Sequence, residues 1–321
     1  MKEISVGDQL DHYRVDALVA TGNDASIFRG VDLKDGTVVA IKVPHVELEL
    51  DPVFHERFRR EQEIGQKLSH PGVMKVLPSE HHSRDYIVME WVNGRPLRDI
   101  LAEQGKLSQD RATRIAIGIC DAVSYVHSHG VVHRDLQPGH IMVDSNDHIK
   151  LINFGLASQV AAKRITFTSL IPELNSVSYS SPEEIRGGRC DARSDVYSIG
   201  VILYEMLTGK LPFGNAKSIS NINERMAKDI PSPRKIVPSI TPQMQEIIYR
   251  ALERAPVHRY SSAHDFAYDL AHMQDVVVEE RGSRNLNNKT AVWTKNILIY
   301  VAMAVVPILL FVLMMLAAHH R

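Results

Sequence analysis

The 321-residue sequence predicts an α+β fold with two lobes, a small antiparallel β-sheet with one helix and a larger helical lobe, followed by one transmembrane helix. Three observations predict this organisation. Short β-type runs separated by turn residues occupy the first 90 residues. Apolar residues at three- and four-residue spacing begin after about residue 95. A long uncharged apolar run lies close to the C-terminus.

The composition sets outer limits on the function. With 44% hydrophobic and 23% charged residues, the chain has the composition of a folded protein, which excludes a disordered chain and a disulfide framework. The 37 basic and 38 acidic side chains nearly cancel, so no overall field favours nucleic acid as a partner. Cys120 and Cys190 form no CxxC pair. Their separation argues against a metal knuckle and is typical of a reducing compartment.

The small lobe is predicted over residues 13–90. A charged stretch with helical potential, residues 54–68, interrupts its strands and ends at His70-Pro71-Gly72. Turn residues such as Lys34-Asp35-Gly36 separate the β-type runs. Strands are predicted at residues 13–20, 25–32, 37–44 and 86–89.

The large lobe is predicted over residues 93–275. Apolar residues recur at helical spacing from Ala112 to Val126 and from Val196 to Met206, which predicts two buried or amphipathic helices. Residues 276–296 have no clear period and a polar centre. We interpret them as a juxtamembrane linker.

The transmembrane helix is predicted over residues 297–318. These 22 residues carry no charge, and at about 1.5 Å rise per residue they span roughly 30 Å of hydrocarbon. The alternative is a buried core helix, but core helices rarely run so long without a polar side chain. More basic residues precede the run than follow it, so the positive-inside rule predicts a single-pass protein of the cell membrane with its large N-terminal part in the cytoplasm. The first fifteen residues have no apolar region typical of a signal peptide.

Chemistry-bearing residues occur in a fixed order along residues 13–275. Lys42 ends the run Val39-Ala40-Ile41-Lys42, and Glu61 follows in the charged helical stretch. The later members are His133-Arg134-Asp135, Asn153-Phe154-Gly155, Ser181-Pro182-Glu183, Asp195 and Arg259. This order and spacing resemble the protein-kinase signature set. Through RFRREQEIGQKLSHPGVMKVL, YIVMEWVNGRPLRDIL and SDVYSIGVILYEMLTGKLPF, the chain is most similar to the eukaryotic-like Ser/Thr kinases of bacteria.

The resemblance implies a bilobal protein-kinase fold and ATP as the cofactor. It gives Lys42 the role of binding the α- and β-phosphates while paired with Glu61, and Asp135 the role of catalytic base. Glu183 and Arg259 correspond to the structural ion pair of the large lobe, and Asp195 to the aspartate that braces the catalytic loop. The nucleotide-binding residues carried over are Gly22 in the phosphate-covering loop, Ile27, Ala40 and Met142 around adenine, Met89 as gatekeeper, and the hinge from Glu90 to Val92.

The chain departs from the family pattern where phosphates and metals bind. Gly22 is retained in the phosphate-covering loop, but Ala20 and Ala25 replace its neighbouring glycines. In the catalytic loop, neutral Gln137 stands where the family has lysine. The two metal-binding positions carry His140 and Asn153 in place of asparagine and aspartate. Mg²⁺ prefers hard oxygen ligands, so no metal site is predicted, although Asn153 and His140 are the residues at the metal positions.

These departures predict a pseudokinase, a nucleotide-binding scaffold or allosteric partner of another protein such as an active kinase. ATP could bind with Mg²⁺, with Mn²⁺ or without a metal. One alternative is a weakly active or atypical ATP-dependent Ser/Thr kinase that phosphorylates protein hydroxyls with Asp135 as base. Another is a membrane adaptor that binds no nucleotide. Thr166 and Thr168 are candidate phosphorylation sites that could pair with Arg134, although an ordinary loop is the simpler interpretation.

Overall fold

The computed structural model describes residues 3–48, 51–78, 83–159, 177–214 and 229–279. Met1–Val276 form one compact unit, and Val277–Arg321 form a second one. The predicted transmembrane helix and the candidate sites Thr166 and Thr168 lie outside the described residues, as does most of the predicted linker. Within the described ranges, the structure contains no helix that combines the length and the apolar character needed to cross a membrane.

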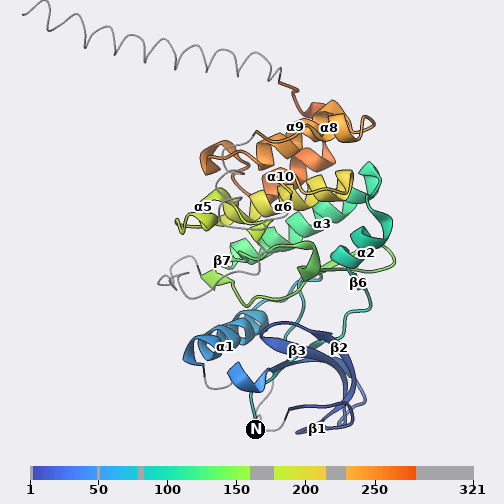
Figure 1. Cartoon of the computed structure of the whole chain (residues 1–321), viewed down its shortest axis with the longest axis vertical. Helices are drawn as coiled ribbons and strands as arrows, with labels where there is room; N and C mark the ends of the chain where they lie inside the picture. The colour runs from blue at the N-terminus through green and yellow to red at the C-terminus, as the bar shows by residue number, and fades with distance from the viewer. Residues whose placement is uncertain (1–2, 49–50, 79–82, 160–176, 215–228, 280–321) are drawn as a thin grey trace, which may run out of the picture. The chain divides into compact units, whose positions relative to one another are not determined.

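The N-terminal lobe is built on a five-stranded antiparallel sheet in the order β1 to β5, and helix α1 lies beside the sheet (Figure 1). Alternate residues of each strand face opposite sides of a sheet. Val39 and Ile41 therefore join one core with Tyr13 and Phe28, whereas Ala40 belongs to a second core on the helix side. The strands are β1 Gln9–Leu10, β2 Tyr13–Thr21, β3 Ala25–Asp32, β4 Val38–Pro44 and β5 Ile87–Glu90.

Helix α1, Pro52–Lys67, covers the second core. It begins two residues before the predicted start because Asp51 caps it, accepting hydrogen bonds from the N–H groups of the next turn, and because proline is favoured at the first helical position. Its C-terminal end is anchored. A Cβ on Gly65 would lie 2.2 Å from a methyl of Val76, and Ser69 N donates to Tyr125 Oη at 2.9 Å.

The C-terminal lobe is mainly helical, as predicted, with α6 at its centre (Figure 1). The apolar residues of α6 are buried on every side of the helix, which is typical of a central helix. Gly209 ends α6 in the left-handed conformation, with φ of 68°. The helices are α2 Leu97–Gln104, α3 Gln109–Ser128, α5 Pro182–Ile185, α6 Ala192–Thr208, α8 Pro233–Ile236, α9 Pro242–Ala251 and α10 Ala263–Ala271, with 3₁₀ turns η1 Val46–Leu48, η2 Pro138–His140, η4 Pro256–His258 and η5 Met273–Asp275.

Five short strands of this lobe hold two loops in place. β8 pairs with β6 and β9 in one sheet, and β7 pairs with β10 in another. The segment from His133 to His140 therefore runs between β7 and β8, and the segment from Asn153 to Ala157 between β9 and β10. The strands are β6 Arg95–Pro96, β7 Val131–Val132, β8 Ile141–Val143, β9 Ile149–Leu151 and β10 Ser158–Gln159.

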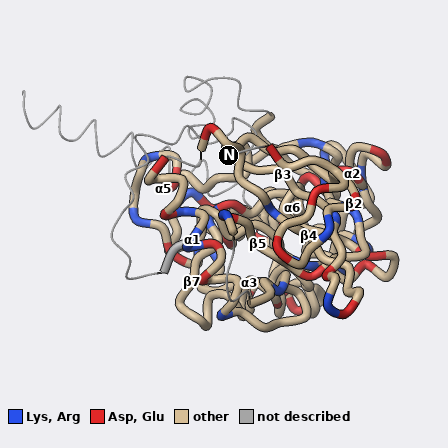
Figure 2. Tube along the Cα trace, turned by 90° about the horizontal axis from the view of Figure 1, so that it is seen from below, with Lys and Arg blue, Asp and Glu red and all other residues tan. Residues whose placement is uncertain are grey.

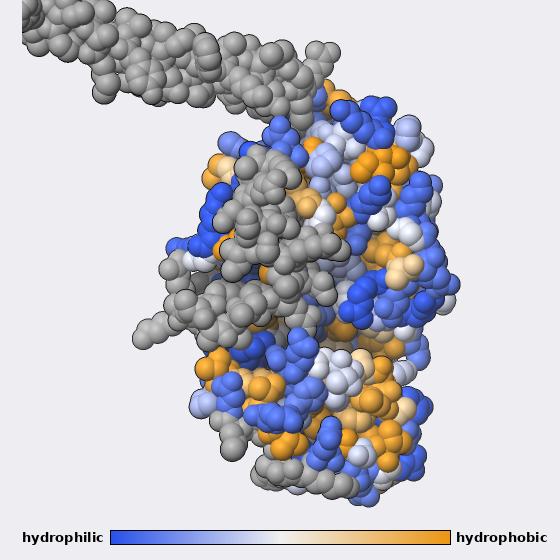
Figure 3. Space-filling view, in the orientation of Figure 1, coloured by the Kyte–Doolittle hydropathy of each residue, from blue (hydrophilic) through white to orange (hydrophobic). Residues whose placement is uncertain are grey.

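The surface of the described residues is mixed in character. Lys and Arg are interspersed with Asp and Glu along the chain (Figure 2). On the face shown in Figure 3, hydrophobic residues are scattered among hydrophilic ones. The distribution agrees with the near-neutral net charge, so recognition must depend on local sites.

Candidate active site between the two lobes

Lys42 on β4 and Glu61 on α1 form a largely buried ion pair. Lys42 Nζ lies 2.8 Å from Glu61 Oε1 and 2.6 Å from Oε2. The exposed fractions of the two side chains are 16% and 6%. Ile27 is the cross-strand partner of Lys42, and Glu61 lies on the buried face of α1. The pair therefore fixes a cation at the inner face of the sheet.

Apolar side chains beside this ion pair form one side of the predicted adenine slot. Ala40, Met89, Ile27 and Val92 belong to one cluster. Ala40 and Met89 are cross-strand partners on β4 and β5. Met142 lies half-buried on β8 of the other lobe and is not a member of that cluster. The structure thus brings four of these five residues together.

Several hydrogen-bonding groups of the predicted hinge, Glu90 to Val92, are engaged within the protein. Glu90 N donates to Lys75 O at 3.0 Å, and Glu90 Oε1 accepts from Lys75 N at 2.8 Å and from Lys150 Nζ at 2.7 Å. Val92 O accepts from Gly94 N at 3.0 Å. Within the described ranges the Val92 N–H has no partner, so it is a hinge donor that an adenine can use.

Asp195, in the first turn of α6, holds the catalytic loop. Its carboxylate accepts from His133 N at 2.8 Å, from Arg134 N at 2.9 Å and from His127 Nε2 at 2.7 Å. Burial opposes the charged form, but the hydrogen bond and charge of His127 hold the pKa of Asp195 below its usual range. Arg134 has a φ of 65°, and this bracing keeps the loop in that otherwise unfavourable conformation. The predicted role of Asp195 is confirmed.

His133 packs inside the loop as a neutral side chain. It is fully buried, and burial lowers the pKa of His133 to about 4. Its Nδ1 accepts from Asp135 N at 3.3 Å, and its ring lies 4.9 Å from that of Phe154 between centroids. Phe154 is itself buried in the core of the large lobe. The ring contact joins the catalytic loop to the segment that carries Asn153.

Asp135, the predicted base, lies between two substituted residues. Gln137 Nε2 donates to Asp135 Oδ1 at 3.2 Å, and His140 Nδ1 lies 2.7 Å from Asp135 O. The carboxylate remains on the loop and keeps one oxygen beside an amide donor. A lysine at position 137 would instead bring a positive charge to this place.

The two metal-binding positions face each other. Asn153 Nδ2 lies 2.9 Å from His140 Nε2. His140 Nδ1 lies 2.7 Å from Asp135 O and 3.4 Å from Asp135 Oδ2, so with Nδ1 as the donor, Nε2 accepts from the Asn153 amide. Asn153 Oδ1 accepts from Gly155 N at 3.3 Å, and the φ of 67° at Asn153 suits asparagine. The pair does not fit Mg²⁺, which requires oxygen ligands in a tight octahedron.

The sequence did not indicate three residues that neighbour the site, which are Lys150, Arg57 and Asp24. Lys150 joins the hinge residue Glu90 to β9, and no spacing rule indicates an ion pair between residues so far apart in sequence. Arg57 on α1 contacts Asp24 in the phosphate-covering loop at 3.3 Å. Arg57 lies four residues before Glu61, so helical periodicity could have placed both side chains on one face.

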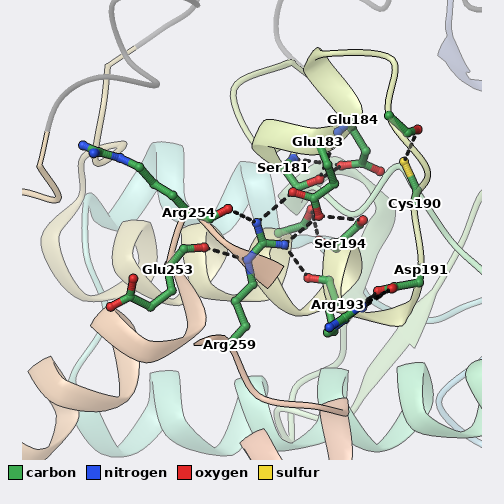
Figure 4. Close-up of polar contacts among 12 residues, drawn as sticks. Ser181, Glu183, Glu184, Cys190, Asp191, Arg193, Ser194, Glu253, Arg254 and Arg259 are labelled. Carbon is green, nitrogen blue, oxygen red and sulfur yellow. Dashed lines mark hydrogen bonds and ion pairs between the residues drawn. The ribbon is translucent and has the colours of Figure 1, made fainter. Parts of the chain in front are cut away.

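The predicted ion pair between Glu183 and Arg259 is confirmed (Figure 4). Arg259 Nη1 donates to Glu183 Oε1 at 2.7 Å and Nη2 to Oε2 at 2.8 Å, the two-bond geometry of a strong pair. The Arg259 side chain is fully buried. Its remaining hydrogen bonds go to the backbone carbonyls of Arg193, Glu253 and Arg254. The pair joins α5 to the segment before α10.

Glu184, beside this pair, predicts a specific pH dependence of stability. Burial raises the pKa of Glu184 from 4.5 to about 8. The folded protein therefore retains a proton that the unfolded chain releases, and stability falls as pH rises from about 4.5 towards 8. We expect Glu184→Gln, which mimics the protonated acid, to remove part of this decline. Thermal unfolding at pH 6, 7, 8 and 9 measures it.

The matched control for this prediction is Glu63→Gln, because Glu63 is an exposed residue of α1. The control should leave the pH profile of the melting temperature unchanged. Parallel profiles for wild type and Glu184→Gln would contradict the assignment of a buried proton to Glu184.

Comparison with known proteins agrees with this geometry. The protein kinase domain family matches residues 13–271. The chain therefore belongs to the protein kinase family, and membership implies ATP binding. The bilobal protein-kinase fold predicted from the sequence is confirmed.

Three relatives illustrate the similarity. The chain is 33% identical over 272 residues to the probable serine/threonine-protein kinase PknB of Corynebacterium glutamicum, covering 82% of this chain and 42% of that protein. It is 33% identical over 259 residues to the serine/threonine-protein kinase PrkC of Bacillus subtilis, covering 80% and 40%. The crystal structure of the Mycobacterium tuberculosis PknI kinase domain matches with a TM-score of 0.66 at 24% identity, covering 84% of this chain and 100% of that domain, and indicates the fold alone. The chain spans about two fifths of the length of the two curated relatives.

Proposed function

We propose that this protein is a membrane-anchored, Ser/Thr-kinase-like protein that binds nucleotide, transfers phosphate poorly and acts as a signalling scaffold or allosteric partner. The observation that carries the proposal is the contact between His140 and Asn153, in which the two metal-binding positions satisfy each other. Phosphoryl transfer depends on positioning and charge neutralisation, and loss of one preorganised electrostatic group costs about 10² to 10³ in rate.

Nucleotide binding is supported by the parts of the site that are intact. Lys42 is held by Glu61, the apolar cluster contains Ala40 and Ile27, and the Val92 N–H has no partner within the described ranges. These groups supply one cation, an apolar slot and a hinge donor. They can bind an adenine nucleotide without a metal ligand from the protein.

The anchor and the partner are inferred from the sequence. We assign membrane attachment to residues 297–318 and place the kinase domain in the cytoplasm. A protein partner, such as an active kinase, would be recognised by the folded domain and brought to the membrane. The Ser/Thr class rests on the similarity to the named bacterial kinases.

A weakly active Ser/Thr kinase is the second candidate. Asp135 is retained on a loop braced by Asp195, and Lys42 is correctly paired with Glu61. In this alternative, Asp135 accepts the proton of a protein hydroxyl while Lys42 positions the phosphates. The two candidates share the nucleotide site and differ in rate.

The deciding experiment measures nucleotide binding and phosphoryl transfer on the full chain in detergent micelles. We expect ATP to raise the melting temperature with Mg²⁺, with Mn²⁺ and with EDTA, and Lys42→Met to abolish the shift. We expect phosphoryl transfer to a generic protein substrate below about 10⁻² s⁻¹, compared with roughly 1–100 s⁻¹ for active kinases.

Two results would reject the proposal. Transfer faster than about 1 s⁻¹ that is lost in Asp135→Asn would establish the active-kinase alternative. Absence of a nucleotide-dependent shift with either metal and with EDTA would favour an adaptor that binds no nucleotide. Partner binding that survives Lys42→Met would support the adaptor further.

A further inference from the structure

Two ion pairs connect helix α1 to the N-terminal sheet and to the loop between β2 and β3. Lys42 pairs with Glu61, and one helical turn earlier Arg57 Nη2 lies 3.3 Å from Asp24 Oδ2. Arg57 and Glu61 are four residues apart, so the two side chains lie on the same face of α1, about 6 Å apart along its axis. The charges are reversed: β4 supplies the cation of the first pair, and the loop between β2 and β3 supplies the anion of the second.

Asp24 belongs to the loop that covers the phosphates in protein kinases. The strand register places it directly beyond Ala25, the partner of Pro44, and Lys42 is two residues before Pro44. The second ion pair therefore lies beyond Lys42 at the phosphate end of the site. Arg57 is the residue of α1 that reaches this loop.

The backbone of this loop is held independently of Arg57. Gly22 N donates to Ala25 O at 2.9 Å, and His45 N donates to Asp24 O at 3.1 Å. His45 Nδ1 also lies 3.1 Å from Asn23 O. Changes to the charge of Asp24 or Arg57 should therefore leave the loop in place and alter the electrostatics of the site.

Arg57 has more hydrogen-bonding capacity than it uses. Its side chain is 19% exposed and makes one long contact with a carboxylate that is 47% exposed. Within the described ranges its buried Nε has no partner. Arg59, on the same helix, contacts both Glu56 and Glu63. A guanidinium has five donors in a fork that matches phosphate oxygens, so Arg57 has the unused donors that a phosphate can engage.

The site needs such a cation because the protein offers few others. Gln137 and Asn153 carry no charge, and the contact between Asn153 and His140 does not fit Mg²⁺. Lys42 shares its charge with Glu61. The triphosphate of a metal-free nucleotide would otherwise lack compensation at its β- and γ-phosphates.

We propose that Arg57 is a phosphate-binding residue of the nucleotide site and that Asp24 occupies its guanidinium in place of a phosphate when no nucleotide is bound. The ligand class is a nucleoside di- or triphosphate without a divalent cation. The inference rests on the proposed nucleotide-binding function and adds the residue that binds the terminal phosphates. Nucleotide and Asp24 then compete for the same side chain.

The test measures affinity in EDTA by calorimetry on the full chain in detergent, with ATP, AMP and inorganic tripolyphosphate as probes. We expect Arg57→Gln to lower the affinity for ATP and for tripolyphosphate about tenfold, equivalent to about 1.4 kcal/mol of binding free energy. We expect Asp24→Asn to raise the affinity for both ligands about threefold, because the substitution removes an anion that competes for Arg57. AMP, which lacks the terminal phosphates, should bind equally to all variants. The control Arg59→Gln should bind all three probes with the affinity of the wild type.

The opposite signs of the two effects make the inference falsifiable. If Arg57→Gln and Asp24→Asn change ATP affinity in the same direction, the pair acts as a mechanical latch and the inference is wrong. Unchanged affinity in Arg57→Gln also overturns it. If the wild type binds no nucleotide under any condition, the proposed function fails. Binding of tripolyphosphate by Asp24→Asn in that case would still support Arg57 as the phosphate ligand, and its absence would overturn the inference.

Discussion

Replacing Asn153 by Asp, His140 by Asn and Gln137 by Lys together is expected to raise the rate of phosphoryl transfer by at least about 10². The exchange removes the contact between the two metal-binding positions, 2.9 Å in the present structure, and puts carboxylate and amide oxygens in their place. The new lysine would supply a positive charge beside Asp135, where Gln137 now donates a neutral hydrogen bond.

The scaffold that these changes need is already assembled. Lys42 is paired with Glu61, Phe154 is buried against His133, and Asp195 braces the loop. Transfer of labelled phosphate from Mg²⁺-ATP to a generic protein substrate is the measurement.

Two controls separate chemistry from folding in this experiment. The triple variant carrying Asp135→Asn should return to the background rate, because the predicted base is removed. Asn153→Asp alone should gain less than the triple variant, because His140 would still occupy the second metal position. A triple variant that melts like wild type but gains no activity would show that these three residues do not limit phosphoryl transfer.

Replacing Arg259 by Met is expected to destabilise the large lobe by about 3–5 kcal/mol, because it leaves the Glu183 carboxylate without its buried partner. The guanidinium also donates to three backbone carbonyls, which would lose their donor. The expected drop in melting temperature is roughly 10 °C. Differential scanning fluorimetry of the kinase-like protein measures it.

The matched control is Arg95→Met, which removes an exposed arginine paired with Glu103 at 2.8 Å. Exposed pairs contribute about 0–1 kcal/mol, so the melting temperature should hardly change. Should Arg259→Met fail to fold, Glu183→Gln provides a milder break, because it keeps an oxygen to accept from Arg259. Equal melting temperatures for Arg259→Met and Arg95→Met would refute the prediction.

The parts of the fold that could be predicted are those set by local pattern and order. Alternating residues in β4 place Val39 and Ile41 on one face and Ala40 on the other, and this period is visible in the sequence. The pairing of Lys42 with Glu61 followed from the family order of motifs. Helix α1 begins two residues before its predicted start, because the cap at Asp51 depends on local geometry that apolar periodicity does not indicate.

The contacts that define this particular site could not be predicted. Substitutions at His140 and Asn153 were visible, but their hydrogen bond depends on a positive φ at Asn153 and on the placement of two loops by β7 to β10. These strands have two or three residues each, too short for a periodic signal. The contact between Arg57 and Asp24 joins residues 33 apart in sequence, with β3 and β4 between them.

Helix α1 is held along its length, by Phe54 and Phe58 in the second core and by contacts at its C-terminal end. Its C-terminal end is fixed by the close approach of Gly65 to Val76 and by the hydrogen bond from Ser69 to Tyr125. If the helix tilts about its C-terminal end, the residues furthest from that end move furthest. Arg57 is further from the pivot than Glu61, so a partner that tilts α1 would separate Arg57 from Asp24 before it separates Glu61 from Lys42. Partner binding and phosphate binding would then both change the contacts of Arg57.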